Sequence, residues 1–127
     1  MKLSTAMEDY LEAILMIRNT GEKIRVKSLA QRLNIKPPSV IDMLKNMANN
    51  GYVVHESRGD IQLTKTGSRI AGKIKKRHEL LTKFFHEILG LDIKTANIDA
   101  CKVEHFLSRK TCERLVEYMD SIEKQTS

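Results

Sequence analysis

Apolar residues recur at helical spacing from the start of the chain. The first stripe consists of Met7, Leu11, Ile14 and Leu15. Asn19 and the polar residues after it end this run, which predicts a first helix. Thr5 and Glu8 have the spacing of a capping box, with the Thr5 hydroxyl accepting from the amide of Glu8. Residues 24–26 are expected to form a short extended piece.

Two more helices with a tight turn between them are predicted next. Residues 27–33 carry apolar positions with the spacing of a short helix, which stops at Asn34. Pro37 and Pro38 suit the first turn of the following helix because proline has a preset φ and needs no amide partner there. Its buried stripe is expected to be Val40, Met43, Leu44 and Met47. This helix should end at residues 49–51.

A β-hairpin and a second helical region complete the predicted order. Residues 52–55 and 61–64 are β-prone segments, and the Ser-Arg-Gly-Asp turn lies between them. Two helices, a tight turn and a hairpin are the order of a winged helix-turn-helix. One long helix is expected over residues 66–89. Asp92 can cap a helix that reaches about Leu107, and Ser108 can cap the last one. The predicted fold class is therefore mainly α with a small β wing.

Length and composition restrict the class of protein. The 127 residues form one domain or two small units that share a core. No apolar run approaches the ~20 residues that cross a bilayer, and the N-terminus lacks the apolar region of a secretory signal, so we expect a cytoplasmic protein without membrane contact. Cys101 and Cys112 form no C-x-x-C pair, which predicts reduced thiols.

The positive charge is concentrated in the middle of the chain. Residues 21–78 hold thirteen basic and four acidic side chains, a net charge of +9, whereas residues 1–20 carry −1 and residues 79–127 carry −2. Such a segment is typical of a surface that meets a polyanion. A solvated basic face remains the alternative on charge alone.

The second helix of the predicted helix-turn-helix supplies candidate DNA contacts. With its apolar stripe buried, its polar side would face a major groove. Free amides at its N-terminus, the Ser39 hydroxyl and nearby Lys36 could hold a phosphate. Asp42 is unusual beside a polyanion, although a carboxylate can accept from cytosine N4 or cap locally. The candidate contacts are Lys36, Pro38, Ser39, Asp42, Lys45, Asn46 and, at the wing tip, Arg58. Taken singly, such residues also occur on any surface helix.

A second group of residues has the chemistry of a metal site. Cys101, Glu104 and His105 are spaced i, i+3 and i+4, which predicts one helix face. Asp9 and Glu12 share a face of the first helix, and His78 lies on the long helix. Thiolate, carboxylate and imidazole together suit a divalent ion between Mn²⁺ and Zn²⁺ and do not suit Ca²⁺ or Mg²⁺.

Each member of this group also has a purely structural explanation. Acidic residues favour the first turn of a helix, Cys101 can be core filling, and His78 can be an ion-paired surface residue. Catalysis by Cys101 with His105 would need a substrate cleft that the sequence does not indicate. Residues 78–82 read H-E-L-L-T and lack the second histidine of a zinc-protease H-E-x-x-H motif, so we expect no enzyme.

The chain resembles the diphtheria-toxin-repressor family of metal-dependent transcription repressors, in particular its short manganese transport regulators. Three segments carry the resemblance: residues 7–12 (MEDYLE), 77–81 (RHELL) and 99–105 (DACKVEH). It implies a winged helix-turn-helix DNA-binding domain over residues 1–72 and a helical metal-binding and dimerisation domain over residues 73–127. It also implies a homodimer that binds a palindromic operator.

The resemblance is a hybrid of two types. Asp9 and Glu12 are similar to the manganese-type pattern, whereas the iron-type repressors carry methionine at the position of Asp9. Cys101 is similar to the iron-type pattern, whereas the manganese regulators carry glutamate at that position. Thr82 and Asn97 stand where an ancillary iron-type site would have a glutamate and a histidine. Mn²⁺ and Fe²⁺ therefore both remain open as the cofactor, with one or two ions per subunit.

The resulting hypothesis is that metal binding and DNA binding are linked. Without a cation, the carboxylates and the thiolate would concentrate like charge and loosen the site. With a cation, the first helix would be tied to the dimerisation helices, and the spacing of the two DNA-reading helices would be fixed. The competing hypothesis is a winged-helix regulator that senses a small molecule or nothing.

Overall fold

A computed structural model describes residues 3–56 and 60–126, and they form two compact units, residues 1–73 and 74–127. The predicted fold class is confirmed: the elements are mostly helical, with one two-stranded antiparallel sheet. No helix in the described part of the chain is long and apolar enough to cross a bilayer.

The first helix, α1 (Thr5–Asn19), begins one residue earlier than the capping box predicted. Ser4 has extended backbone angles and its hydroxyl accepts from the Met7 amide at 3.1 Å, so Ser4 is the N-cap. The prediction for Thr5 is therefore wrong, because Thr5 already lies inside the helix. Ser4 can take this role because serine is as good a cap as threonine.

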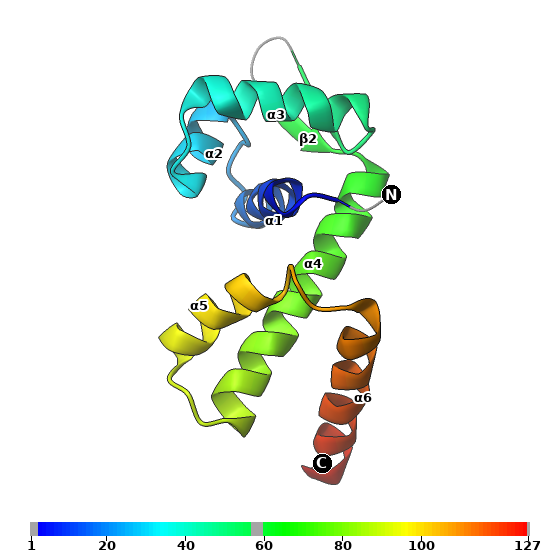
Figure 1. The fold of residues 1–127 in the computed structure, drawn as a ribbon. Helices are drawn as coiled ribbons and strands as arrows, with labels where there is room; N and C mark the ends of the chain where they lie inside the picture. The colour runs from blue at the N-terminus through cyan, green and yellow to red at the C-terminus, as the bar shows by residue number, and fades with distance from the viewer. Residues whose placement is uncertain (1–2, 57–59, 127) are drawn as a thin grey trace. The chain divides into compact units, whose positions relative to one another are not determined.

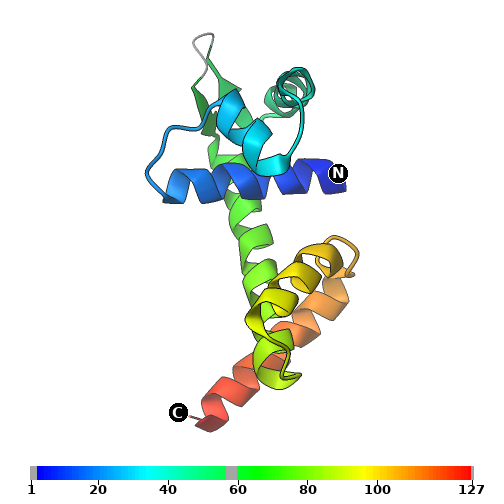
Figure 2. The same ribbon diagram turned by 90° about the vertical axis from the view of Figure 1, so that its left-hand side faces the viewer.

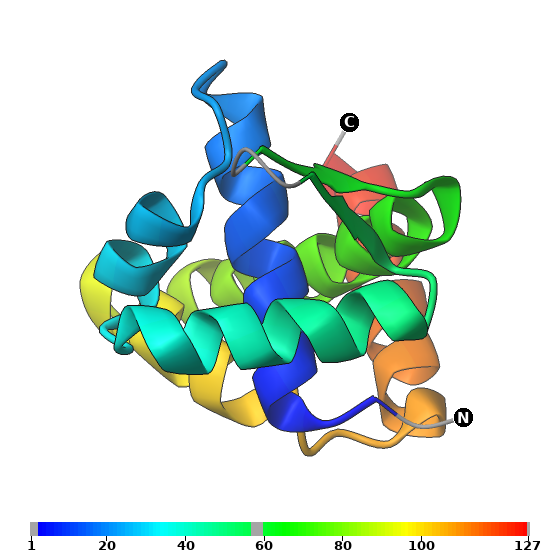
Figure 3. The ribbon, with the colours of Figure 1, turned by 90° about the horizontal axis from the view of Figure 1, so that it is seen from above.

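The helix-turn-helix is formed by α2 (Val26–Leu33) and α3 (Pro37–Asn49). Val26 begins α2, so the expected extended piece does not include it. Asn34 ends α2 in the left-handed conformation at φ 56°, which lets the chain reverse within a few residues. Figures 1 and 3 show α3 lying across α1, and Figure 2 shows α2 beside α1.

The core of the first unit forms where these helices meet. Its fully buried side chains include Leu11, Ile14, Leu29, Val40, Leu44 and Met47. The predicted stripe of α3 is thus buried except for Met43, which is half-buried. The wing consists of β1 (Val53–His55) and β2 (Ile61–Leu63), with Val53 opposite Leu63.

The wing leads into α4 (Lys65–Lys83) through a compact junction at Thr64. The Thr64 hydroxyl donates to the Gly51 carbonyl oxygen at 2.6 Å and accepts from the Gly67 amide at 3.0 Å. Gly67 lies directly against the Tyr52 carbonyl group, where a Cβ atom would collide with the Tyr52 oxygen. The junction therefore requires glycine at position 67.

The long predicted helix does not continue to Leu89 as an α-helix. After Lys83 the chain forms a π-helical turn, η1 (Phe84–Ile88), and Gly90 follows with φ 75°. His86 Nδ1 lies 2.7 Å from the Leu91 carbonyl oxygen and ties this turn to the next loop. A π-turn leaves no clear mark in apolar periodicity, which explains the difference.

Two capped helices complete the second unit. Asp92 accepts from the Thr95 amide at 3.1 Å and begins α5 (Ile93–Val103), and hydrogen bonds from Thr95 lower the pKa of Asp92. Ser108 accepts from the Thr111 amide at 3.1 Å and begins α6 (Arg109–Thr126). Both predicted caps are confirmed. Figures 1 and 2 show α5 and α6 flanking the second half of α4.

The junction at Thr64 gives a stability prediction. Replacing Gly67 with alanine should lower the free energy of unfolding by about 1–3 kcal/mol, because the rigid Tyr52 carbonyl group cannot make room for a methyl group. Gly72→Ala is the matched control in the same helix, since nothing lies within 4 Å of a Cβ atom there. It should raise stability by about 0.5–1 kcal/mol. Urea unfolding of both variants measures the difference, and equal midpoints would contradict the predicted collision.

Candidate metal centre and nucleic-acid interface

Three potential metal ligands converge within the second unit. One donor atom from each of His78 on α4, Cys101 on α5 and Glu104 at the end of α5 lies within 4.8 Å of the other two. Glu104 is fully buried, with none of its surface exposed to solvent. Burying a carboxylate in this way is costly unless positive charge or hydrogen bonds compensate for it.

The end of α5 decides which groups surround Glu104. The helix ends at Val103, although the Glu104 amide still donates to the Ala100 carbonyl oxygen at 3.0 Å. Glu104 therefore keeps its place one turn after Cys101. His105 lies in the turn that follows, so the prediction that it shares a continuous helix face with Cys101 is wrong.

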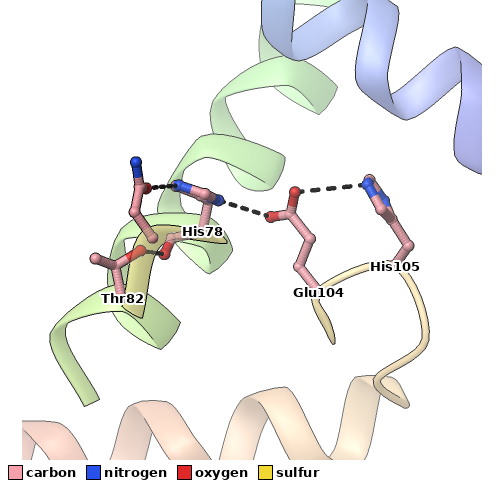
Figure 4. Close-up of polar contacts among 5 residues, drawn as sticks. His78, Thr82, Glu104 and His105 are labelled. Atoms are coloured by element: carbon pink, nitrogen blue, oxygen red, sulfur yellow. Dashed lines mark hydrogen bonds and ion pairs between the residues drawn. The ribbon is translucent and has the colours of Figure 1, made fainter. Parts of the chain in front are cut away.

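Two imidazoles face the two oxygens of Glu104 (Figure 4). His78 Nδ1 lies 3.9 Å from Oε2, and His105 Nε2 lies 3.7 Å from Oε1. Both separations exceed an ordinary hydrogen bond. Within the described part of the chain, the buried His78 Nδ1 atom has no hydrogen-bond partner. If Nδ1 carries a lone pair, it faces the Glu104 carboxylate with no proton between the two groups.

The second ring nitrogen of His78, Nε2, contacts a side chain of α5. This Nε2 atom lies 2.6 Å from the Asn97 side-chain oxygen Oδ1. The Thr82 hydroxyl donates to the His78 main-chain oxygen at 2.8 Å (Figure 4). In the sequence, Asn97 stands out only as a departure from an ancillary iron-type site. Its spacing of four residues from Cys101 is the signal that places both on one side of α5.

The donor set fits a divalent transition ion. Sulfur, nitrogen and carboxylate oxygen all bind such ions, and bonds of ~2.0–2.3 Å place ligands on opposite sides of one ion up to ~4.6 Å apart. The separations within the cluster, up to 4.8 Å, need only small side-chain adjustments to reach that geometry. The ring nitrogens of His105 are not among the converging donor atoms. His105 Nε2 instead lies 3.7 Å from Glu104 Oε1.

The other two predicted ligands belong to the first unit. Asp9 and Glu12 lie on α1, three residues apart, and both are half-buried. Their spacing places them on the same side of that helix. Their part in a metal site stays a prediction.

The outer side of α3 carries the predicted DNA contacts that the structure describes. The exposed residues there include Lys36, Pro38, Ser39, Asp42, Lys45 and Asn46. Arg58 lies outside the described residues. Because Val40, Leu44 and Met47 are fully buried, the polar side of α3 is turned to solvent over its whole length. A role in DNA contact stays a prediction for each of them.

One detail of the expected phosphate site is wrong. Pro37 and Pro38 have no N–H groups, and the Ser39 amide donates to the Lys36 carbonyl oxygen at 3.0 Å. The first three positions of α3 therefore offer no free amide to a phosphate. A contact at this end of α3 would depend on the side chains of Lys36 and Ser39.

Comparison with known families identifies the chain. Residues 2–61 match the N-terminal DNA-binding domain of iron-dependent repressors, and residues 64–126 match the metal-binding and dimerisation domain of the same repressors. The chain belongs to the iron-dependent repressor family. It is thus a metal-dependent, DNA-binding transcription repressor that forms dimers, and the family is one of regulators and not of enzymes.

Curated relatives of this repressor extend over most of its length. An uncharacterized HTH-type transcriptional regulator of Methanocaldococcus jannaschii is 44% identical over 119 residues, covering 93% of this chain and 95% of the relative. The HTH-type transcriptional regulator MntR of Lysinibacillus sphaericus is 32% identical over 120 residues, covering 94% of this chain and 85% of the relative.

Solved structures of similar repressors include bound metals. A manganese-dependent transcriptional repressor in complex with manganese matches with a TM-score of 0.83 and 26% identity over 90% of this chain. The structure of ScaR with bound Zn²⁺ matches with a TM-score of 0.78 and 26% identity over 90% of this chain. This repressor spans about half the length of these chains, 52% of the manganese complex and 53% of ScaR.

The geometry around Glu104 gives a binding prediction. Glu104→Gln keeps the size of the side chain but removes a charged ligand, so Mn²⁺ should no longer stabilise the variant. The unchanged protein should gain about 2.7 kcal/mol at a Mn²⁺ concentration of 100 times its Kd. Thermal unfolding with and without Mn²⁺ measures this gain. The control is Glu113→Gln, an exposed glutamate paired with Arg109 at 3.4 Å, which should respond like the unchanged protein. Full stabilisation of Glu104→Gln would remove Glu104 from the site.

Proposed function

We propose that Mn²⁺ or Fe²⁺ activates this repressor to bind a palindromic operator. The observation that carries the proposal is the convergence of His78, Cys101 and Glu104 inside the unit that matches a metal-binding and dimerisation domain. In this proposal residues 1–72 contact DNA, and residues 73–127 bind one or two ions per subunit and form the dimer. The setting of such a regulator is the cytoplasm, where its operator lies.

The proposed ligands are His78, Cys101, Glu104 and His105 from the second unit and Asp9 and Glu12 from α1. Cys101 is exposed, so its thiol is accessible to an incoming ion. A thiolate favours the softer Fe²⁺, whereas three carboxylates favour Mn²⁺. Relatives named as manganese regulators support the second choice, and the cysteine supports the first.

Charge explains how these residues would link the site to DNA. Asp9, Glu12 and Glu104 repel one another when they are ionised and close together. A bound divalent ion supplies the positive charge that lets them approach. Asp9 and Glu12 would then hold α1, and with it the α3 packed across α1, to the dimerisation unit. This restricts the spacing of the two α3 helices in a dimer, which must match half-sites about 34 Å apart.

Exposed apolar side chains in the second unit support its role in dimerisation. The largest exposed fractions belong to Phe106 at 83%, Ile93 at 58% and Leu89 at 56%. Ile98, Val116 and Tyr118 are also exposed. So many exposed apolar groups in 54 residues are typical of a surface that a partner covers.

Operator binding with each metal tests the proposed function. A palindromic duplex can be selected from a random library by the protein with and without metal. Anaerobic titration with Mn²⁺, with Fe²⁺ and with chelator should show that metal raises operator affinity by ~5–150-fold, the usual range of allosteric coupling. His78→Ala should abolish this increase without changing binding in chelator. Equal operator affinity with and without metal would favour the alternative, a winged-helix regulator that does not sense metal.

The exposed side of α3 gives a separate prediction. Lys36→Ala should weaken binding to any DNA sequence, because Lys36 is expected to neutralise a phosphate. The slope of log affinity against log salt should fall by about 0.9 for each lost contact, or about two per dimer. Lys110→Ala, an exposed lysine in α6, is the matched control and should leave the slope unchanged. An unchanged slope in Lys36→Ala would exclude Lys36 as a phosphate contact.

A further inference from the structure

His78 has two ring nitrogens in opposite environments. Nε2 lies 2.6 Å from Asn97 Oδ1, a distance typical of a strong hydrogen bond. Nδ1 lies on the other side, 3.9 Å from the buried carboxylate of Glu104. The ring therefore lies between two groups that both accept hydrogen bonds, and a neutral imidazole has only one proton to donate.

The proton can satisfy only one of these acceptors. On Nε2 it is donated to Asn97, and Nδ1 then carries a lone pair that faces Glu104. On Nδ1 it would point at the carboxylate and block the nitrogen that a metal needs. Glu104 favours the second arrangement, because an anion attracts the ring proton. Asn97 opposes this preference from the outer side of the ring.

Among the described residues, the hydrogen-bond partner recorded for Nε2 is Asn97. The Thr82 hydroxyl is used by the His78 main-chain oxygen at 2.8 Å. Beside the ring is an open hollow of about 290 Å³, whose lining includes Thr82, His86 and Asn97 and also the carboxylates of Glu79 and Glu87. Without the Asn97 amide, Nε2 would lose the partner at 2.6 Å that competes with Glu104 for the proton.

We propose that Asn97 is a positioning residue that keeps the proton of His78 on Nε2 and so directs Nδ1 into the metal site. The inference rests on the proposed function, because it concerns how one ligand is prepared for metal. It also assigns a role to the position where the family resemblance led us to expect a histidine. Outer hydrogen-bond partners of ligating histidines commonly act in this way.

The tautomer can be measured directly in the metal-free protein. Long-range proton–nitrogen NMR of ¹⁵N-labelled histidine distinguishes a protonated ring nitrogen from an unprotonated one. The unchanged protein should show the proton of His78 on Nε2, and Asn97→Ala should shift it towards Nδ1. Asn97→Asp keeps an acceptor oxygen and should restore the Nε2–H form. The proton on Nδ1 in the unchanged protein, or no change in Asn97→Ala, would overturn the proposal.

Metal affinity provides the second readout. Calorimetric titration with Mn²⁺ should show a ~10–100-fold weaker Kd for Asn97→Ala, and Asn97→Asp should recover most of that loss. Lys94→Ala, an exposed residue one turn earlier in α5, is the matched control and should bind as the unchanged protein does. Equal affinity in Asn97→Ala would overturn the proposal. Failure of the unchanged protein to bind Mn²⁺ would instead contradict the proposed function, and the NMR comparison would still decide the tautomer.

Discussion

The buried carboxylate of Glu104 is the constraint around which the second unit is arranged. A fully buried anion needs compensation, and here both of its oxygens face imidazole nitrogens at 3.7 and 3.9 Å. The helix α5 ends at Val103, and His105 in the turn after it lies on one side of the carboxylate while His78 approaches from α4. The distances are too long for hydrogen bonds and suit a site that gains stability when a cation enters. In the proposed function, stability and metal response would therefore depend on the same side chain.

The first unit, in contrast, is stabilised by apolar packing. Its core consists of apolar side chains from α1, α2, α3 and β1, and α3 is held by the buried Val40, Leu44 and Met47. The junction of Thr64 and Gly67 fixes the start of α4 without any charged group. The exposed side of α3 is thus positioned by packing alone. In the proposed function, metal would therefore act on where this unit is held and not on whether it folds.

The sequence predicted the elements whose signals are local. The apolar stripe of α3, the Asp92 and Ser108 caps and the β-hairpin all depend on residues close together in the chain. The failures have equally specific causes. Ser4 and Thr5 are both competent caps, so only the backbone decides between them. The π-turn after Lys83 and the end of α5 at Val103 keep an apolar pattern that a continuous helix would also show. The prediction of free amides at the start of α3 failed because Pro37 and Pro38, which precede Ser39, have no N–H groups.

The metal ligands were predicted from chemistry and from the family resemblance. Of the six predicted ligands, three have donor atoms that converge within the second unit.

Asn97 and Cys101 show how one helix can combine ligation with support. They lie four residues apart on the same side of α5, and one contacts the outer face of His78 while the other joins its inner face at the cluster. In the proposed site, a change of residue type at position 101 would alter the softness of the donor set, whereas a change at position 97 would alter the state in which His78 meets the ion. Neither Asn97 nor Cys101 is buried, so both positions can vary at little cost in packing. Metal preference would therefore change by single replacements on this helix face while the buried Glu104 and the fold around it stay the same.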